Sequence, residues 1–394
     1  MYVNYKMQHF FLNHIQYFLL SLSLVAGAIV VIPFGTQLYM IGLFYLLCYS
    51  FYYRSNDLYL GRYYIIFIIT CLISTFVSDS FNYRLFAFIA IIITCTPITI
   101  SRKLFLFRKI YLKHCLLVFP ILSVISLFCY IYGINYCQKE GNVLDFSAIF
   151  PHPMWMGAAV GLSNVVIIWS MFTSNKICFR LVYLLILLLS IYITIVSGSR
   201  VALFASLVSM ILLIIIKLHS IKKIFLAICI ISVTTIILLP IYLSGAERMR
   251  GKFESSKGKY GSRTEIFERS LKHFNDTPVF GVGFAVSFDE LGNKDIGRME
   301  SGSGWLSILV QTGIVGFSII VVILLNLYKV FRYLRCDNEL LLFFVAFIYL
   351  CLHSIFEGYI LTVGYYPCII FWCLLGYLYT YPYYKNTIYI IEKS

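Results

Sequence analysis

Apolar runs of about 20 residues, separated by short polar segments, recur along most of this 394-residue chain. A helix needs roughly 20 apolar residues to cross a hydrocarbon layer about 30 Å thick. The pattern therefore predicts an all-α polytopic membrane protein with about twelve transmembrane helices. The expected spans are 15–33, 36–53, 63–78, 84–100, 115–133, 154–173, 181–197, 201–217, 224–243, 303–327, 340–358 and 364–381.

One polar segment is far longer than the others and divides the chain into three parts. Residues 1–243 hold nine spans, residues 244–302 form the long segment, and residues 303–394 hold three spans and a short tail. The long segment is the only polar stretch of the sequence with enough residues for a small domain. We expect it to be one large extracytoplasmic loop.

An amphipathic helix is predicted within this loop, at residues 261–274. Phe267, Leu271 and Phe274 recur at helical spacing and form one apolar stripe. Asn275 to Pro278 end the helix, and Gly281-Val282-Gly283 then predicts a tight turn. We expect this helix to lie on the membrane surface with its apolar face down.

Composition supports a membrane protein and excludes several other classes. Hydrophobic residues make up 61% of the chain and charged residues only 12%, with a mean hydropathy of +0.88. A soluble protein carries about 25% charged residues, so a soluble enzyme is excluded. The cysteines lie mostly inside apolar runs, where a thiol behaves as a small hydrophobe.

The formal charge of +14 follows mainly from topology. If the N-terminus is cytoplasmic, 18 Lys and Arg residues fall in inner loops and termini, and only three fall in short outer loops. Basic residues gather on the cytoplasmic side of membrane proteins. The sequence therefore predicts cytoplasmic N- and C-termini and indicates no nucleic-acid partner.

The other ten basic residues lie in the long outer segment and are unevenly spread. Its first part, up to Arg263, contains Arg248 and Arg250 and is mostly basic, whereas acids dominate its second part. Arg263 falls in the first turn of the predicted helix, where free backbone N–H groups favour a phosphate. A solvated loop of mixed charge is the competing interpretation.

Several short motifs resemble one family of bacterial envelope proteins. They are Phe150-Pro151-His152-Pro153-Met154, Ser197-Gly198-Ser199-Arg200, Gly261-Ser262-Arg263 leading through the predicted helix to Thr277–Gly283, and Gly304-Trp305-Leu306-Ser307-Ile308-Leu309-Val310-Gln311-Thr312-Gly313-Ile314-Val315-Gly316. Their order and spacing resemble the O-antigen ligase and O-antigen polymerase (Wzy-type) superfamily over residues 145–380.

The resemblance implies about twelve helices with one large periplasmic loop in the bacterial inner membrane. It implies a substrate of oligosaccharide repeats on undecaprenyl diphosphate, and glycosyl transfer without metal, nucleotide or other cofactor. A chain-length regulator and a flippase are the protein partners considered. Ligases of the family carry a His about eleven residues before the glycine that corresponds to Gly313 in the last motif, and Gly302 stands there in this chain. That departure favours a polymerase over a ligase.

The candidate catalytic residues follow from the chemistry of this transfer. A guanidinium binds phosphate oxygens in pairs and is always charged, so Arg200 and Arg263 are expected to stabilise the leaving diphosphate. Glu300 is the candidate to accept the proton of the acceptor hydroxyl. The competing interpretations are an interface anchor for Arg200 and a solvated loop carboxylate for Glu300.

Four further residues are candidates for substrate binding. Arg248 and Arg250 could hold the diphosphate, and His152 and Glu357 could contact sugar. A structural loop histidine and an ion-paired carboxylate are the alternatives for His152 and Glu357. No metal-ligand spacing occurs among the seven histidines.

Two other functions remain open at this stage. The first is ligase-type transfer of finished glycan to another acceptor. The second is a transporter of lipid-linked glycan without chemistry. Transporters usually show repeated halves and ionisable residues at the membrane midplane, and this sequence shows neither.

Overall fold

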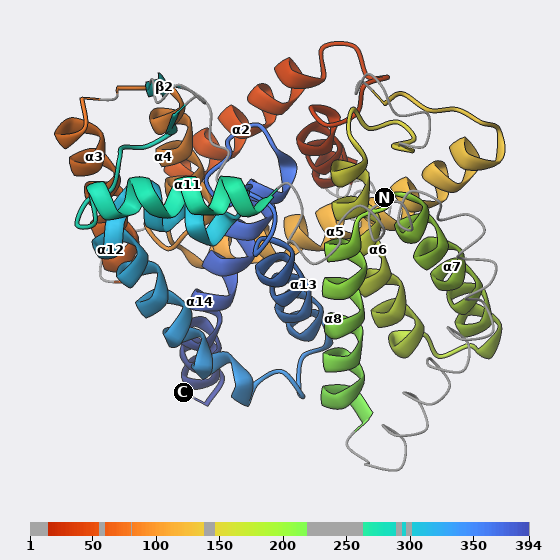
Figure 1. Cartoon of the computed structure of the whole chain (residues 1–394). Helices are drawn as coiled ribbons and strands as arrows, with labels where there is room; N and C mark the ends of the chain where they lie inside the picture. Colours follow the sequence, from red (N-terminus) through yellow and green to blue (C-terminus); the bar gives the residue numbers. More distant parts are fainter. Residues whose placement is uncertain are drawn as a thin grey trace.

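The computed structural model describes residues 15–54, 60–79, 81–137, 146–218, 263–288, 294–296 and 302–393. These residues form a helical bundle with one small antiparallel hairpin (Figure 1). The first helix is Ile15–Ala26. The others are α2 (Gly35–Tyr52), α3 (Arg62–Val77), α4 (Arg84–Cys95), α5 (Arg102–Ile131), α6 (Pro153–Thr173), α7 (Ile177–Val196), α8 (Arg200–Leu218), α11 (Arg263–Asp276), α12 (Gly304–Leu325), the 3₁₀ helix η1 (Asn326–Arg332), α13 (Asn338–His353) and α14 (Tyr366–Lys393), with strands β1 (Val286–Phe288) and β2 (Lys294–Ile296).

Eleven of the twelve predicted spans coincide with a helix among the described residues, and the span 224–243 lies outside them. In the part of the chain that the structure describes, five helices are long and apolar enough to cross a membrane: α5, α6, α7, α8, and α12 continued by η1. Four shorter helices are also apolar: Ile15–Ala26, α3, α4 and α13. The structure thus confirms a helical protein with several candidate membrane spans. The number twelve stays a prediction.

The start of α5 differs most from its predicted boundary. The expected span began at residue 115, but α5 begins at Arg102 and runs for 30 residues, about 45 Å. Arg108, which was expected in a loop, is only 4% exposed. Its guanidinium donates to the carbonyl oxygens of Thr94 and Thr99, each at 2.7 Å. These bonds satisfy carbonyls at and beyond the end of α4, which lack helical partners.

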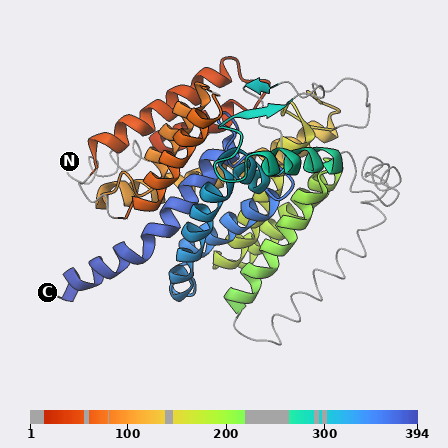
Figure 2. The ribbon, with the colours of Figure 1, turned by 60° about the vertical axis from the view of Figure 1, so that its left-hand side comes forward.

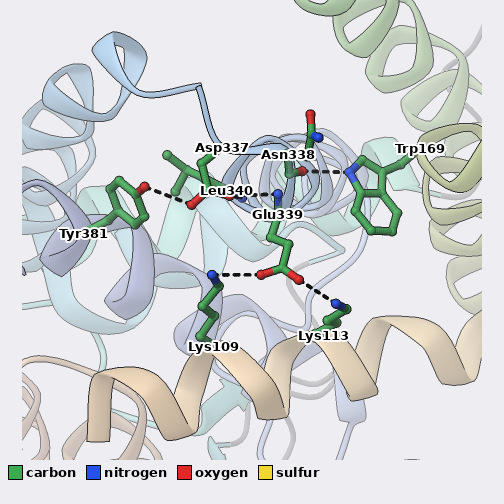
Figure 3. Close-up of polar contacts among 8 residues, drawn as sticks. All are labelled: Lys109, Lys113, Trp169, Asp337, Asn338, Glu339, Leu340 and Tyr381. Carbon is green, nitrogen blue, oxygen red and sulfur yellow. Dashed lines mark hydrogen bonds and ion pairs between the residues drawn. The ribbon is translucent and has the colours of Figure 1, made fainter. Parts of the chain in front are cut away.

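Polar contacts fasten one end of the bundle, here called the Glu339 end (Figure 3). The Glu339 carboxylate, at the start of α13, forms ion pairs with two lysines of α5. Its oxygens lie 2.8 Å from Lys109 Nζ and 2.5 Å from Lys113 Nζ. The Asn338 carbonyl oxygen accepts the indole N–H of Trp169, at the end of α6, at 2.7 Å. These segments, all predicted to be cytoplasmic, therefore lie together.

A second set of contacts gathers the opposite ends of the same helices at what we call the Arg200 end. Gly157 in α6 packs against Ser199, just before α8. The Gly304 N–H donates to the Ser354 carbonyl oxygen at 2.8 Å, which joins the start of α12 to the residue after α13. Segments predicted to be extracytoplasmic therefore also lie together. The side of the membrane that each end faces stays a prediction.

Helix α12 is interrupted at Gly313, where a chain segment from the long loop inserts. Gly313 has φ 66° and ψ −171°, so the helix breaks there. Backbone N–H groups of Val282 and Ile314 donate to the carbonyl oxygens of Val310 and Pro278, each at 2.9 Å. Since an unpaired buried peptide group is costly, the inserted segment 277–285 satisfies groups that the break would leave free.

The inserted segment is buried rather than solvated. Val282, Phe284 and Ala285 are at most 6% exposed. The amide of Gln311 anchors the segment further, because its Oε1 accepts the Ala285 N–H at 3.0 Å. The chain bends at Val282, inside the predicted tight turn 281–283, with positive φ at Gly281 and Gly283.

Replacing Gly313 by alanine is expected to destabilise the protein strongly. A Cβ there would overlap the Val279 carbonyl oxygen, and φ is positive. Strain of about 1–2 kcal/mol adds to about 1–3 kcal/mol of overpacking. The measurement is thermal unfolding of the purified protein in detergent. Gly133→Ala is the matched control, because Gly133 has φ 67° but a Cβ added to it would meet nothing within 4 Å. Equal melting temperatures for the two variants would contradict this interpretation of the break.

Natural cysteines offer a test of orientation. With cytoplasmic termini, Cys137 lies at the Arg200 end and is expected to react with a membrane-impermeant maleimide added to spheroplasts. Exposed Cys178 and Cys336, at the Glu339 end, are expected to react only after permeabilisation. Each should be tested as the sole cysteine. Labelling of Cys336 in intact spheroplasts would contradict the predicted orientation.

Candidate functional site

Arg200 is placed by a short turn of small residues between α7 and α8. Gly198 adopts φ 65°, a conformation that favours glycine. The Ser199 N–H donates to the Ser197 hydroxyl at 3.2 Å. A Cβ on Gly157 would lie only 2.5 Å from the Ser199 Cβ, so α6 approaches this turn very closely. Arg200 is exposed at the first position of α8.

His152 caps the first turn of α6. Its Nδ1 accepts the backbone N–H of Met154 at 3.1 Å, which is a helix N-cap bond. An acceptor at Nδ1 places the proton of a neutral ring on Nε2. The outer nitrogen of His152 is therefore a hydrogen-bond donor, and this geometry favours binding of an oxygen ligand over a role as general base.

The loop between α13 and α14, residues 354–365, connects the motifs of this end. The carbonyl oxygen of its first residue, Ser354, accepts the backbone N–H of Gly304 at the start of α12. At its other end, the Tyr366 hydroxyl donates to the Trp155 carbonyl oxygen at 2.9 Å. The loop therefore links the start of α12 to the start of α6, where His152 lies.

Glu357 lies in this loop and is half-buried. Its carbonyl oxygen would be 3.2 Å from a Cβ on Gly304, so the loop backbone packs on the start of α12. Burial raises the pKa of the neighbouring Tyr359 phenol well above its usual value, and the Glu357 carboxylate is among the smaller contributions that raise it further. Tyr359 remains a neutral hydroxyl, which donates to the Leu350 carbonyl oxygen at 2.6 Å.

Helix α11 packs on α12, and the face it buries differs from the predicted apolar stripe. Its location at the membrane surface stays a prediction. Figure 1 shows α11 lying crosswise over α12. Phe267 and Phe274 pack inward, against Phe356 and the Val282–Val286–Val310 cluster respectively. Leu271, expected on the same stripe, is 47% exposed. The buried face is centred on Ser270, which is 7% exposed, and the rotation follows from packing into the angle between α12 and the inserted segment.

The described residues thus bring together three of the seven predicted site residues at one end: Arg200, His152 and Glu357. The backbone of Arg263 begins α11 at the same end, as predicted. The other three, Arg248, Arg250 and Glu300, lie outside the described residues, and so does the side chain of Arg263. Within the described part of the chain, no three His, Cys, Asp or Glu side chains converge as a metal site requires.

Comparison with known families now adds an independent observation. Residues 185–321 match the model of a family described as O-antigen ligase. The matched stretch is about a third of the chain and is similar to that family. The resemblance of the motifs to the O-antigen ligase and polymerase superfamily is therefore confirmed. A search of curated proteins finds no match.

The matched stretch includes Arg200, Arg263 and residues on both sides of the break in α12. Members of this family are membrane enzymes of the glycosyltransferase kind, and the family implies a lipid-linked glycan substrate. His152 and Glu357 lie outside the matched residues. The structure nevertheless places them beside the matched stretch, through the contacts of α6 with α8 and of the 354–365 loop with α12.

Gly302 has a conformation that explains the departure from the ligase pattern. Its φ is 69°, in the left-handed region, and a Cβ there would lie 3.2 Å from the Phe267 ring. A histidine at this position would be strained and would press on α11. The backbone at position 302 therefore favours glycine. A histidine there would require the surrounding structure to change.

The part that sequence reasoning missed is the 354–365 loop as a structural link. Only Glu357 was singled out there, as a candidate for sugar contact. The loop also contains Tyr359 and Tyr365. Nothing in the sequence singles out these two tyrosines, because aromatic residues are common at every membrane interface.

Proposed function

We propose that this protein polymerises oligosaccharide repeat units carried on undecaprenyl diphosphate, at the extracytoplasmic face of the bacterial inner membrane. The supporting observation is the packing of the four family motifs at one end of the bundle, with Arg200 exposed among them. The absence of a histidine at Gly302, where the backbone favours glycine, supports a polymerase over a ligase. The product would be an O-antigen, a capsule or an exopolysaccharide.

The reaction in this proposal is a single displacement at the anomeric carbon of the donor sugar. An acceptor hydroxyl oxygen forms the new glycosidic bond, and the bond from the anomeric carbon to the diphosphate oxygen breaks. The bond electrons leave with undecaprenyl diphosphate, so negative charge grows on its oxygens. Arg200 and Arg263 would stabilise that charge, and loss of one such preorganised donor typically costs about 10²–10³ in rate.

The acceptor proton needs a base in the same proposal. Glu300 is the candidate, six residues N-terminal to Leu306 in the first turn of α12. His152 is better suited to bind substrate, because its Nδ1 is already an acceptor for Met154. Arg248 and Arg250 would extend the positive surface toward the lipid diphosphate, and Glu357 would contact sugar.

Ligase-type transfer is the second candidate function, because the matching family model carries that description. The two functions differ in the acceptor. A ligase transfers finished glycan to a different molecule, whereas a polymerase extends another lipid-linked repeat. A transporter without chemistry is less consistent with an enzyme family domain.

The glycan profile of a deletion strain separates these functions. Loss of a polymerase is expected to leave single repeats attached to the final acceptor and no longer chains. Loss of a ligase would leave the acceptor bare while lipid-linked polymer accumulates. Loss of a flippase would trap single repeats in the cytoplasmic leaflet. Long chains that persist after deletion would refute the proposal.

Arg200→Ala is expected to lower polymer synthesis by about 10²–10³ at normal expression, because it removes a diphosphate ligand. Arg200→Lys should retain part of the activity, since it keeps the charge but loses the paired donors. Synthesis of labelled polymer in isolated membranes measures both. Arg84→Ala is the matched control, an arginine that also begins a helix at this end. Unchanged synthesis in Arg200→Ala would remove Arg200 from the mechanism.

A further inference from the structure

A stacked aromatic pair lies at the Arg200 end, and its role is not explained by the proposed chemistry. The rings of Trp155 and Tyr365 have centroids 4.2 Å apart and planes inclined by 20°. Tyr365 is 8% exposed, whereas Trp155 is only half-buried. Trp155 is therefore stacked on a buried ring and is itself partly exposed.

The surroundings of Trp155 distinguish it from an aromatic residue that anchors a helix in lipid. In α6, 72% of the most apolar 18-residue window is buried, the largest share among the five long helices. Helix α6 packs against α5, α7, α8 and α13. Residues of α6 are therefore mostly shielded from lipid, and Trp155 lies in the first turn of α6, at the Arg200 end.

The pair is held rigidly before any ligand arrives. The backbone N–H of Trp155 donates to the His152 carbonyl oxygen at 3.0 Å. The Trp155 carbonyl oxygen accepts the Tyr366 hydroxyl. Tyr365 packs edge-on against Tyr359 and Tyr366, with centroids 5.9 and 5.1 Å away. Preorganised rings lose little conformational entropy on binding.

A carboxylate lies near the pair, and a guanidinium lies at the same end of the bundle. Burial and then Tyr366 raise the pKa of the Tyr365 phenol, and the Glu357 carboxylate is close enough to raise it further. On α6, Gly157 follows Trp155 by two residues and packs against Ser199, which directly precedes Arg200. Aromatic rings, an acceptor for hydroxyls and a cation suited to phosphate therefore occur at one end of the bundle.

We propose that Trp155 and Tyr365, with Glu357, form a binding site for the pyranose ring that is joined to the diphosphate. This inference rests on the proposed function, in which Arg200 binds that diphosphate. The C–H face of the sugar would lie on the exposed face of Trp155, where aromatic rings offer large apolar area. A sugar hydroxyl would donate to the Glu357 carboxylate in a charge-assisted bond. The site would select the first sugar of each repeat.

Binding by the purified full-length protein in detergent tests the site without requiring turnover. The first probe is the oligosaccharide released by mild acid from the lipid-linked fraction of the source cells. The second probe is inorganic diphosphate. Calorimetry is expected to show that Trp155→Leu weakens saccharide binding about tenfold and leaves diphosphate binding unchanged. Arg200→Ala should do the reverse.

Two control variants make the result specific. Trp155→Phe keeps an aromatic face and should bind saccharide within about threefold of the wild type. Tyr132→Leu removes an aromatic residue that is 73% exposed, at the end of α5, and should change neither affinity. Saccharide binding that is absent from the wild type, or that is equal in Trp155→Leu, would overturn the proposal. Equal weakening of both probes by Trp155→Leu would also overturn it, because that result indicates general disturbance.

The sugar-site proposal and the polymerase proposal can fail independently of each other. If saccharide binding depends on Trp155 but the deletion strain still makes long chains, the polymerase proposal fails and the sugar site stands. If the deletion strain lacks long chains but binding does not depend on Trp155, the sugar site fails and the polymerase proposal stands.

Discussion

The hydrogen bonds between segment 277–285 and the interrupted helix α12 fasten the chain after α11 to the bundle. Helix α12 breaks at Gly313, and the inserted peptide supplies partners for the groups around the break. A break inside an apolar bundle is tolerated only where protein satisfies the backbone. The same insertion buries Val282 and Phe284 and provides the surface on which α11 docks. Arg263, at the start of α11, therefore depends on a glycine 50 residues away.

The two ends of the bundle use charge differently. At the Glu339 end, basic residues of α5 are paired with an acid at the start of α13, or satisfy backbone carbonyls as Arg108 does. Figure 2 shows α14 extending beyond its neighbours toward the C-terminus. At the Arg200 end, an exposed arginine stands among hydroxyls, aromatic rings and glycines. The first arrangement fastens helices together, and the second presents a cation at the surface.

Much of the helical pattern could be predicted from the sequence, because apolar periodicity and length determine it directly. The motifs were also found, since Ser197 to Arg200 and Gly304 to Gly316 are contiguous. The start of α5 was misplaced because Lys and Arg were taken as loop residues, whereas these side chains pair with Glu339 and with carbonyls from other helices. Those partners are distant in sequence and leave no local signal.

The orientation of α11 shows the same limit. The sequence predicted the helix but not the face that it buries. Phe267 and Phe274 can share a buried face with Leu271 or with Ser270, which lie next to each other around the helix. Contacts with α12 and the inserted segment decided between them. The Trp155–Tyr365 pair was equally invisible, because its members are 210 residues apart. The sequence of an apolar chain does not indicate which of its aromatic residues pack together.

Reconstitution of the purified protein is the most direct test of the central claim, that this single chain joins lipid-linked repeats. Proteoliposomes would contain only the protein and the lipid-linked repeat unit isolated from source cells, with no metal or nucleotide added. Mass spectrometry should detect lipid-linked products of two and more repeats, together with one released undecaprenyl diphosphate for each bond formed. Recovery of single repeats alone, from folded wild-type protein at saturating substrate, would contradict the account.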